Sequence, residues 1–305
     1  MGQSEKKTWK ENEAPVGRWI AVTVFAIVVG SLIGAVLGVI IKFLPVWGEG
    51  SVLAPFEQFF VTVSSFAGIY ICFVLGLKWF CKTSMKSFMF GRDRKPDVKN
   101  ALVAGGLLFA GMLVTTLISA KNISYEHQSI GTVLLNILFC VMFLWIQTST
   151  EEIIFRGIWL RAPYHNDIPV LPKGLLFAAI SSLLFMAAHL YNPEIRALSF
   201  GIDLILGALS YFISAFMMYV CNLLIGGMEA GLIFHFINNF YSMVISREEV
   251  SVLANPTILV DHSKQSTGTQ EFFIEMGMYI LPLAYLLWHR YRCKGNHGRR
   301  KGAGS

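Results

Sequence analysis

The amino-acid sequence predicts an all-α fold, a polytopic transmembrane helical bundle of about eight spans. Composition gives the first reason, because 54% of the 305 residues are hydrophobic and only 14% are charged. Soluble domains carry about a quarter charged residues. The mean hydropathy of +0.57 shows how apolar the chain is as a whole. The apolar residues also form long blocks, each near the roughly 20 residues that cross a hydrocarbon core.

A single membrane domain, residues 1–305, accounts for the whole length. Its first apolar block is longer than the apolar region of about 7–15 residues in a secretory signal, so we expect an uncleaved helix. The polar loop 247–270 and the tails 1–18 and 291–305 are too short to fold separately. The expected spans are residues 19–44, 56–80, 98–120, 130–155, 173–191, 197–221, 223–246 and 271–290.

The lysines and arginines are distributed unevenly between the loops. Most of the 25 fall in the two tails and in the alternate loops between them. Basic residues favour the cytoplasmic side, so both termini are predicted to be cytoplasmic. This placement explains the net charge of +6 without a nucleic-acid partner. We expect a multi-pass protein of a bacterial cell membrane, surrounded by the lipid bilayer, in an oligomeric state that the sequence leaves open.

Three glycines of the first span lie four residues apart, at positions 30, 34 and 38. Small residues at this spacing let two helix backbones approach closely. The pattern favours packing inside the chain over dimerisation.

Ionisable residues inside a membrane are costly, so each one is a candidate for function. The fourth span ends with the adjacent carboxylates Glu151 and Glu152, and Arg156 follows. Glu152 and Arg156 are four residues apart and share a helix face, so they can form an ion pair. Glu151 points elsewhere, without a partner nearby in the sequence, which suits a general base. Both glutamates could instead be structural residues at the membrane interface.

Two further spans carry polar residues at one-turn spacing. The fifth span places Phe185 and His189 on one face, and the seventh does the same with His235 and Asn239. Asn238 lies near that second face. Taken singly, each group could make only interhelical hydrogen bonds. Glu229, near the beginning of the seventh span, could line a cavity or lie at the interface.

Together these residues are the parts of a hydrolytic site. A carboxylate can deprotonate water, imidazole can position it, and histidine and asparagine can donate hydrogen bonds to an oxyanion. Glu151, His189 and His235 are also a plausible zinc set with an open fourth position. The His-Glu-x-x-His zinc helix is absent from the sequence. The spacing alone does not decide between these two chemistries.

The three motifs resemble a known family, the CAAX protease and bacteriocin-processing (CPBP, or Abi) intramembrane endopeptidases. That family has Glu-Glu-x-x-x-Arg, Phe-x-x-x-His and His-x-x-x-Asn on three successive membrane helices. The matching residues here run from Glu151 to Arg156, from Phe185 to His189 and from His235 to Asn239. The resemblance covers residues 130–245, the expected catalytic core.

The resemblance implies cleavage of a peptide bond in a peptide or membrane-protein substrate, with prenylated C-termini as one class. It implies that Glu151 and His189 activate water, that His235 and Asn239 hold the oxyanion, and that Glu152 and Arg156 brace the helix. Phe185, Asn238 and Glu229 are possible cavity residues. The family is also described as a metalloprotease; we expect no required cofactor and keep zinc as the alternative.

The predicted topology places Glu151 toward the inner end of its span and His189 toward the outer end of the next. The two can meet only if the helices tilt or if residues 156–172 dip into the bilayer, which is allowed where a segment lines a wet cavity. We therefore expect a site in the middle of the membrane that opens to water through a polar funnel.

Two other functions remain open at this point. The chain could be a non-proteolytic bacteriocin-immunity or scaffold protein that keeps the fold and binds a partner. It could also be a proton-coupled transporter, because buried Glu and His build proton relays. The absence of inverted repeats and broken helices in the sequence disfavours the transporter.

Overall fold

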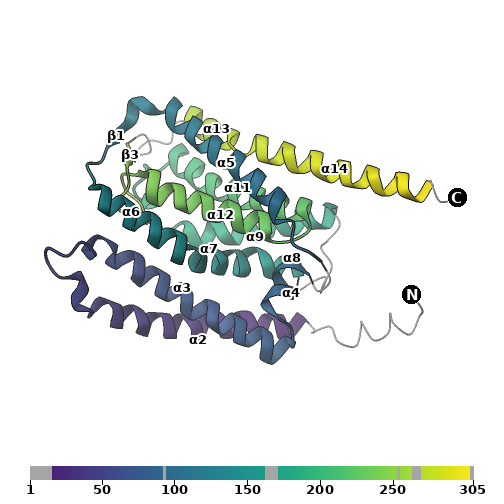
Figure 1. Ribbon diagram of the computed structural model, residues 1–305, viewed down its shortest axis with the longest axis horizontal. Coiled ribbons are helices and arrows are strands. Elements are labelled where there is room, and N and C mark those ends of the chain that lie inside the picture. Colours follow the sequence, from purple (N-terminus) through teal and green to yellow (C-terminus); the bar gives the residue numbers. More distant parts are fainter. Residues whose placement is uncertain (1–15, 92–93, 162–170, 253–254, 263–268, 303–305) are drawn as a thin grey trace.

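A computed structural model describes residues 16–91, 94–161, 171–252, 255–262 and 269–302. This described part of the chain is all-α apart from one small sheet (Figure 1). The α-helices are α2 (Val16–Lys42), α3 (Glu57–Gly76), α4 (Met85–Phe90), α5 (Val98–Ile118), α6 (Ile130–Phe139), α7 (Trp145–Glu152), α8 (Ile158–Arg161), α9 (Leu171–His189), α10 (Pro193–Arg196), α11 (Ile202–Ile225), α12 (Glu229–Phe240), α13 (Thr269–Gly277) and α14 (Ile280–Gly302).

Within the described residues, six helices are long and apolar enough to cross a membrane, so the chain has the architecture of a multi-pass membrane protein. They correspond to six of the eight predicted spans. The fifth predicted span is a shorter apolar helix, Lys173–His189. The seventh is α12, which is buried among α5, α7 and α11 (Figure 1). The total number of spans and the side of the membrane that each terminus occupies stay predictions.

Helices α2 and α3 form a closely packed pair along one flank of the bundle (Figure 1). A Cβ atom on Gly34 would lie 2.5 Å from the backbone oxygen of Ser65, and one on Gly30 would lie 2.5 Å from Cα of Ile69. Only a glycine fits at such distances. The glycine spacing therefore serves packing inside the chain, as predicted.

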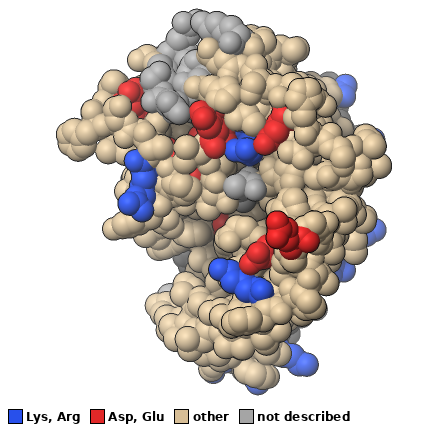
Figure 2. All heavy atoms as spheres, turned by 90° about the vertical axis from the view of Figure 1, so that its left-hand side faces the viewer, with Lys and Arg blue, Asp and Glu red and all other residues tan. Residues whose placement is uncertain are grey.

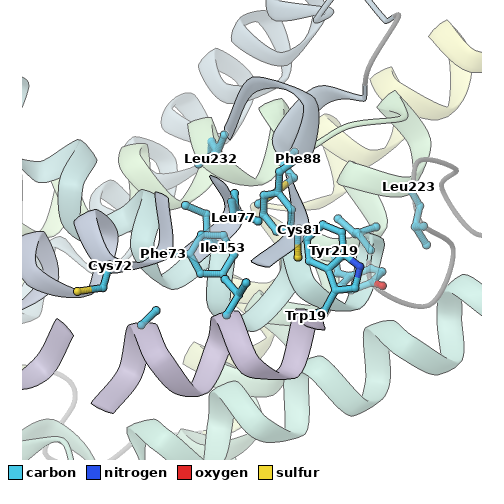
Figure 3. Packing of buried hydrophobic residues seen from close by; sticks show 14 of the residues in the cluster. Trp19, Cys72, Phe73, Leu77, Cys81, Phe88, Ile153, Tyr219, Leu223 and Leu232 are labelled. Atoms are coloured by element: carbon cyan, nitrogen blue, oxygen red, sulfur yellow. The ribbon is translucent and has the colours of Figure 1, made fainter. Parts of the chain in front are cut away.

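A cluster of buried aromatic and aliphatic residues joins this pair to the rest of the bundle (Figure 3). Phe88 of α4 is its hub, with ring centroids 5.5 Å from Trp19 and 5.2 Å from Phe73. Arg161 is buried beneath α4 and donates from Nε to the carbonyl oxygen of Phe88 at 2.9 Å. The bond satisfies one of the carbonyls that a helix leaves unpaired at its C-terminal end.

The fourth predicted span is longer than expected and runs from Ile130 to Arg161. The prediction ended it at residue 155, because Arg156 and Arg161 looked like loop residues. Both arginines are buried, at 0% and 2% exposure. Two π-helical turns, Cys140–Leu144 and Ile153–Gly157, interrupt this span and flank α7. Such turns are frequent at functional sites.

The extended fourth span changes the geometry that the sequence suggested. Glu151 now lies ten residues before the end of its span, so no reentrant segment is needed to bring it inside the bundle. The predicted dip of residues 156–172 concerns mainly residues 162–170, which lie outside the described part of the chain.

A three-stranded sheet caps one end of the bundle, which the sequence did not predict. Its strands are β1 (Ile123–Tyr125), β2 (Ser246–Glu248) and β3 (Leu259–Asp261). The central strand β3 pairs antiparallel with β1 and parallel with β2. Residues 247–270 are therefore more than the connecting loop that was expected. Buried Asn136 ties α6 to this cap through the carbonyl oxygens of Met243 and Pro256, at 2.6 and 2.7 Å.

The opposite end of the molecule carries α4, the beginning of α2 and the end of α14 (Figure 1). Helix α14 continues to Gly302, whereas the prediction made residues 291–305 a tail. The predicted N-terminal tail, residues 1–18, lies mostly outside the described residues. The two ends of the described chain thus share one end of the molecule (Figure 1).

Candidate active site

The predicted site residues meet where α7 packs against α12. Residues 147 and 151 lie one turn apart on α7, and residues 235 and 239 lie one turn apart on α12. Glu151 contacts His235 while Gln147 contacts Asn239, so the chain directions of the two helices oppose each other. A spacing of four residues on both helices therefore places two polar pairs side by side.

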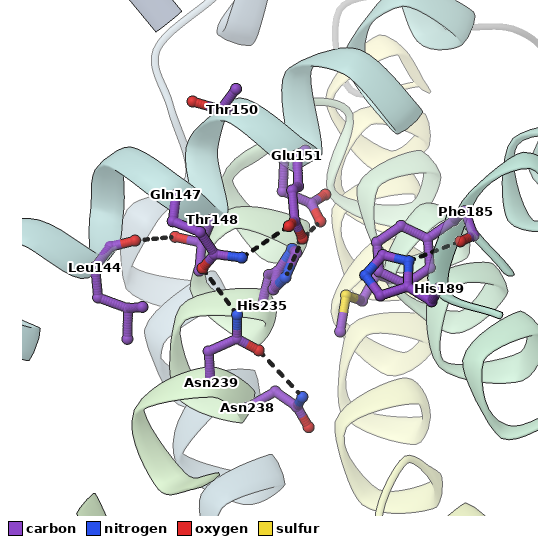
Figure 4. A network of polar contacts seen from close by, with 12 residues as sticks. Leu144, Gln147, Thr148, Thr150, Glu151, Phe185, His189, His235, Asn238 and Asn239 are labelled. Atoms are coloured by element: carbon purple, nitrogen blue, oxygen red, sulfur yellow. Dashed lines mark hydrogen bonds and ion pairs between the residues drawn. The ribbon is translucent and has the colours of Figure 1, made fainter. Parts of the chain in front are cut away.

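A chain of hydrogen bonds connects these four side chains (Figure 4). Asn239 donates from Nδ2 to Oε1 of Gln147 at 2.9 Å. Gln147 in turn donates from Nε2 to Oε1 of Glu151 at 2.8 Å. The other oxygen of Glu151, Oε2, lies 3.1 Å from Nε2 of His235. Glu151 was predicted to have no partner nearby in the sequence, yet Gln147 is one turn away.

The chain continues through Glu152 into a buried ion pair. Oε1 of Glu152 lies 2.8 Å from Nδ1 of His235 and 2.8 Å from Nη1 of Arg156. Glu152 and Arg156 are both fully buried. Buried charges persist only when they are paired. The ion pair that their spacing predicted is present, and its carboxylate also holds Nδ1 of His235.

His235 is held between two carboxylates. Both of its ring nitrogens face a glutamate oxygen. Both contacts can be hydrogen bonds if His235 is an imidazolium that donates twice, or if one glutamate carries a proton. The Glu151–His235–Glu152 unit can therefore hold or move a proton without rotation of its side chains.

His189 approaches this unit from α9. Its Nδ1 lies 2.7 Å from the carbonyl oxygen of Phe185, and the nitrogen on the other side of the ring is turned toward Glu151 and His235 (Figure 4). His189 is near enough to interact electrostatically with Glu151. A hydrogen bond from Nδ1–H to the carbonyl leaves Nε2 to accept one from a water.

Phe185, the aromatic residue one turn before His189, packs against both histidines of the site. Its ring stacks on the His189 ring at 4.0 Å between centroids and meets the edge of His235 at 6.0 Å. The guanidinium carbon of Arg156 lies 4.1 Å from the centroid of the same ring. Phe185 thus joins α9 to the π-helical turn after α7 through the cation–π contact and to α12 through the ring contact with His235.

Two of the predicted cavity residues lie apart from this centre. Asn238 is at its edge and donates from Nδ2 to Oδ1 of Asn239 at 3.5 Å. Glu229 begins α12, where it pairs with Arg94 at 2.5 Å and accepts from the backbone N–H of Asp97 at 2.8 Å. These contacts attach the segment before α5 to α12, outside the hydrogen-bonded chain.

The sequence analysis did not single out three residues that shape the site. Gln147 bridges Glu151 and Asn239, and its position one turn before Glu151 was the available signal. A Cβ on Gly231 would lie 2.7 Å from Oε2 of Glu152 and 2.4 Å from Nδ2 of Asn222. Gly231 also donates its N–H to Asn222 at 2.7 Å. A side chain at this position would therefore push Glu152 and Asn222 out of their present places.

The site has a small cavity beside it on the side of the sheet. The cavity has a volume of about 10 Å³ and is lined by Gln147 together with Gln58, Thr62 and Asn255. That volume is enough for about one water molecule. Figure 2 views the end of the molecule that carries the sheet and shows acidic and a few basic side chains around a hollow. Water can therefore be held next to Gln147, although this cavity is narrower than the funnel that was expected.

Members of the zinc set that the sequence suggested are engaged in other contacts. Among the described residues, no group of three or more His, Cys, Asp or Glu side chains is arranged to hold a metal. In the set that the sequence suggested, both ring nitrogens of His235 face carboxylates and both oxygens of Glu151 are in contacts. His235 and Glu151 would have to separate before they could bind a shared ion.

Comparison with known proteins identifies the segment that carries the site. Residues 133–241 match the family described as type II CAAX prenyl endopeptidase Rce1-like. No curated protein and no solved structure matches the chain. The matched segment lies inside the predicted core, residues 130–245, and contains every residue of the hydrogen-bonded chain. This part of the protein is thus a domain of the Rce1-like family.

Proposed function

We propose that the Rce1-like domain of residues 133–241 makes this chain an intramembrane endopeptidase. The observation that carries the proposal is the buried Glu151–His235–Glu152–Arg156 chain, with His189 turned toward it. Several ionisable side chains at one place inside an apolar bundle are costly, and such residues mark functional sites in membrane proteins.

In the proposed first step, Glu151 removes a proton from a water held between Glu151 and Nε2 of His189. The water oxygen attacks the carbonyl carbon of the scissile peptide bond. The C=O double bond opens and leaves a negative charge on the carbonyl oxygen. Glu151 suits the role of base because its carboxylate is held by Gln147 and His235 and faces His189.

The oxyanion then takes hydrogen bonds from His235 and Asn239. Asn239 uses one amide hydrogen on Gln147 and has a second one to donate. Once Glu151 is protonated it attracts the Nε2–H of His235 less strongly, so that donor can turn to the oxyanion. Donors that are already in place when charge develops contribute several kcal/mol in a dry site.

In the final step the C–N bond breaks and the nitrogen receives the proton that Glu151 took from water. The products are an amine and a carboxylic acid, the acid gives its remaining proton to the amine or to solvent, and Glu151 is ready for the next water. Glu152 and Arg156 touch no reacting atom in this scheme and are positioning residues for His235.

The proposed substrate class is a prenylated peptide or protein C-terminus, on the basis of the family that the domain matches. Lipid-facing helices around the site suit a substrate that reaches it with its prenyl chain in the bilayer. A peptide without the prenyl group should then be cleaved far more slowly.

The experiment uses the purified full-length protein in detergent micelles, with farnesylated and unmodified CAAX peptides and product masses read by mass spectrometry. We expect wild type to cleave one peptide bond of the farnesylated peptide. Glu151→Gln should lower kcat by about 10²–10⁴-fold, the usual contribution of a general base.

Glu49→Gln is the matched control, because it makes the same chemical change on an exposed loop residue, and it should cleave like wild type. Cleavage by Glu151→Gln at the rate of the control would overturn the proposed role of Glu151. Wild type that cleaves neither peptide would count against the proposed activity itself.

A second prediction concerns metal. Since Glu151 and His235 contact each other rather than presenting an open ligand set, activity should survive prolonged treatment with 1,10-phenanthroline. Elemental analysis of active protein should find zinc far below one ion per chain. Stoichiometric zinc, lost together with activity on chelation and restored by adding zinc, contradicts the metal-free scheme.

A further inference from the structure

A second cavity lies at the end of the bundle opposite the sheet, remote from the candidate active site. It has a volume of about 360 Å³, within the range of about 300–1,000 Å³ that is usual for small-molecule sites. The segment before α5, the C-terminal end of α11 and one turn of α14 form its walls. The polar side chains that line it are Arg94, Lys95, Asp97, His289 and Arg290.

Positive charge dominates the lining of this cavity. Arg94, Lys95 and Arg290 contribute three cationic side chains, and Asp97 is the one carboxylate among its lining residues. That carboxylate is already engaged, because Oδ1 accepts from Nδ2 of Asn100 at 2.8 Å and Oδ2 lies 3.0 Å from Nε2 of His289. The N-terminal end of α5, whose helix dipole favours anions, also points here.

Hydrogen bonds fix the two arginines in place but do not use all of their N–H groups. Arg94 donates from Nη2 to the carbonyl oxygen of Ile225 at 2.8 Å, and the same nitrogen pairs with Glu229 at 2.5 Å. Arg290 donates from Nη1 to the carbonyl oxygen of Leu223 at 2.7 Å. A guanidinium has five N–H donors, so these contacts do not use all the donors of either arginine.

Neighbouring residues of α14 indicate the depth of this cavity in the membrane. Trp288 and Tyr291 flank the cavity residues His289 and Arg290 in sequence and are 51% and 81% exposed. The guanidinium of Arg292 lies 4.6 Å from the Trp288 ring centroid. Exposed Trp and Tyr at the end of an apolar helix are typical of the level of lipid headgroups.

From this charge, volume and depth we propose that the cavity binds the phosphate-bearing headgroup of an anionic phospholipid. Arg94 and Arg290 hold the phosphate, Lys95 lies at the mouth, and the acyl chains lie along α14. Basic pockets between membrane helices bind anionic headgroups in this way. The site is independent of the proposed peptidase activity.

The test measures lipid binding to delipidated full-length protein by native mass spectrometry. We expect saturable binding of one phosphatidylglycerol per chain, with clearly weaker binding of phosphatidylcholine. Lys95→Glu should weaken phosphatidylglycerol binding by about tenfold, because a reversed charge at the headgroup level repels the anion. Lys95 is exposed, so the variant should fold.

Lys86→Glu is the matched control. It reverses an exposed lysine on α4, at the same end of the molecule but outside the cavity, and should bind like wild type. Equal weakening by both variants, or equal affinity for the two lipids, would show attraction to general surface charge and overturn the proposal. Saturation by inorganic phosphate with no preference for phosphatidylglycerol would assign the site to a free solute instead of a lipid.

Discussion

The polar side chains of the candidate site lie among apolar residues, so each one needs a polar partner. Glu152 and Arg156 are fully buried and neutralise each other, and Glu152 also holds the ring nitrogen of His235 that does not face Glu151. Removal of one partner from a buried ion pair costs about 3–5 kcal/mol, since it leaves an uncompensated charge. Positioning and stability are therefore linked in the same residues.

Gln147 provides a prediction at this scale. Gln147→Leu keeps the size of the side chain but removes the acceptor of Asn239 and a donor to Glu151. We expect the loss of about 1–3 kcal/mol of stability that unsatisfied buried polar groups cause, together with a lower kcat. Thermal unfolding in detergent and the peptide assay measure the two effects.

Thr148→Val is the matched control for Gln147→Leu. Thr148 is buried on the same helix, but its hydroxyl donates only to the carbonyl oxygen of Leu144. It should keep kcat close to wild type. Equal kcat values for the two variants would mean that Gln147 does not position the site.

The sequence predicted the motif residues and the ion pair, because a spacing of four residues on a helix is independent of tertiary structure. It did not predict Gly231, since the need for a glycine arises only where Glu152 approaches α12. It also missed the partner of Glu151, because attention to charged residues passed over the neutral Gln147. It left the role of Glu229 open, because its partner Arg94 lies far away in the sequence.

At the scale of elements, one flank of the bundle is formed by α2 and α3, which pack closely together. Gly34 and Gly68 lie at the crossing, where the backbones almost touch. Gly106 on α5 is the contrast, because a Cβ there would meet nothing within 4 Å. Substitution by alanine should therefore lower the stability of the protein at Gly34 but not at Gly106.

Gly34→Ala should lower the unfolding temperature, because its new methyl group has to displace the backbone at Ser65. Gly106→Ala should leave the temperature unchanged or raise it, since alanine favours a helix by about 0.5–1 kcal/mol over glycine. Thermal unfolding of both variants in the same detergent gives the comparison. If Gly34→Ala is as stable as Gly106→Ala, the pair is less tightly packed than described here.

Long apolar helices were the elements that the sequence predicted best, because the thickness of a bilayer fixes their length. The predicted ends of helices were wrong where charged residues are buried, as at the end of the fourth span. The sheet was missed because its strands are only three residues long. Such strands depend on pairing between segments far apart in the chain, which local patterns do not reveal.

At the scale of the whole molecule, the account depends on the bundle bringing α7, α9 and α12 to one place. α7 and α12 are joined by hydrogen bonds, whereas the contact of His189 with them runs through the ring of Phe185. The central claim is that Glu151 and His189 act on the same water although no hydrogen bond joins them directly.

Kinetics of the double variant test this claim most directly. The experiment compares kcat/KM on the same peptide for the single variants Glu151→Gln and His189→Gln and for the double variant. The preparations should have matched unfolding temperatures. Residues that act as a unit have non-additive effects, so the double variant should be no slower than the slower single variant. A double variant whose loss equals the product of the two single losses would contradict a shared water.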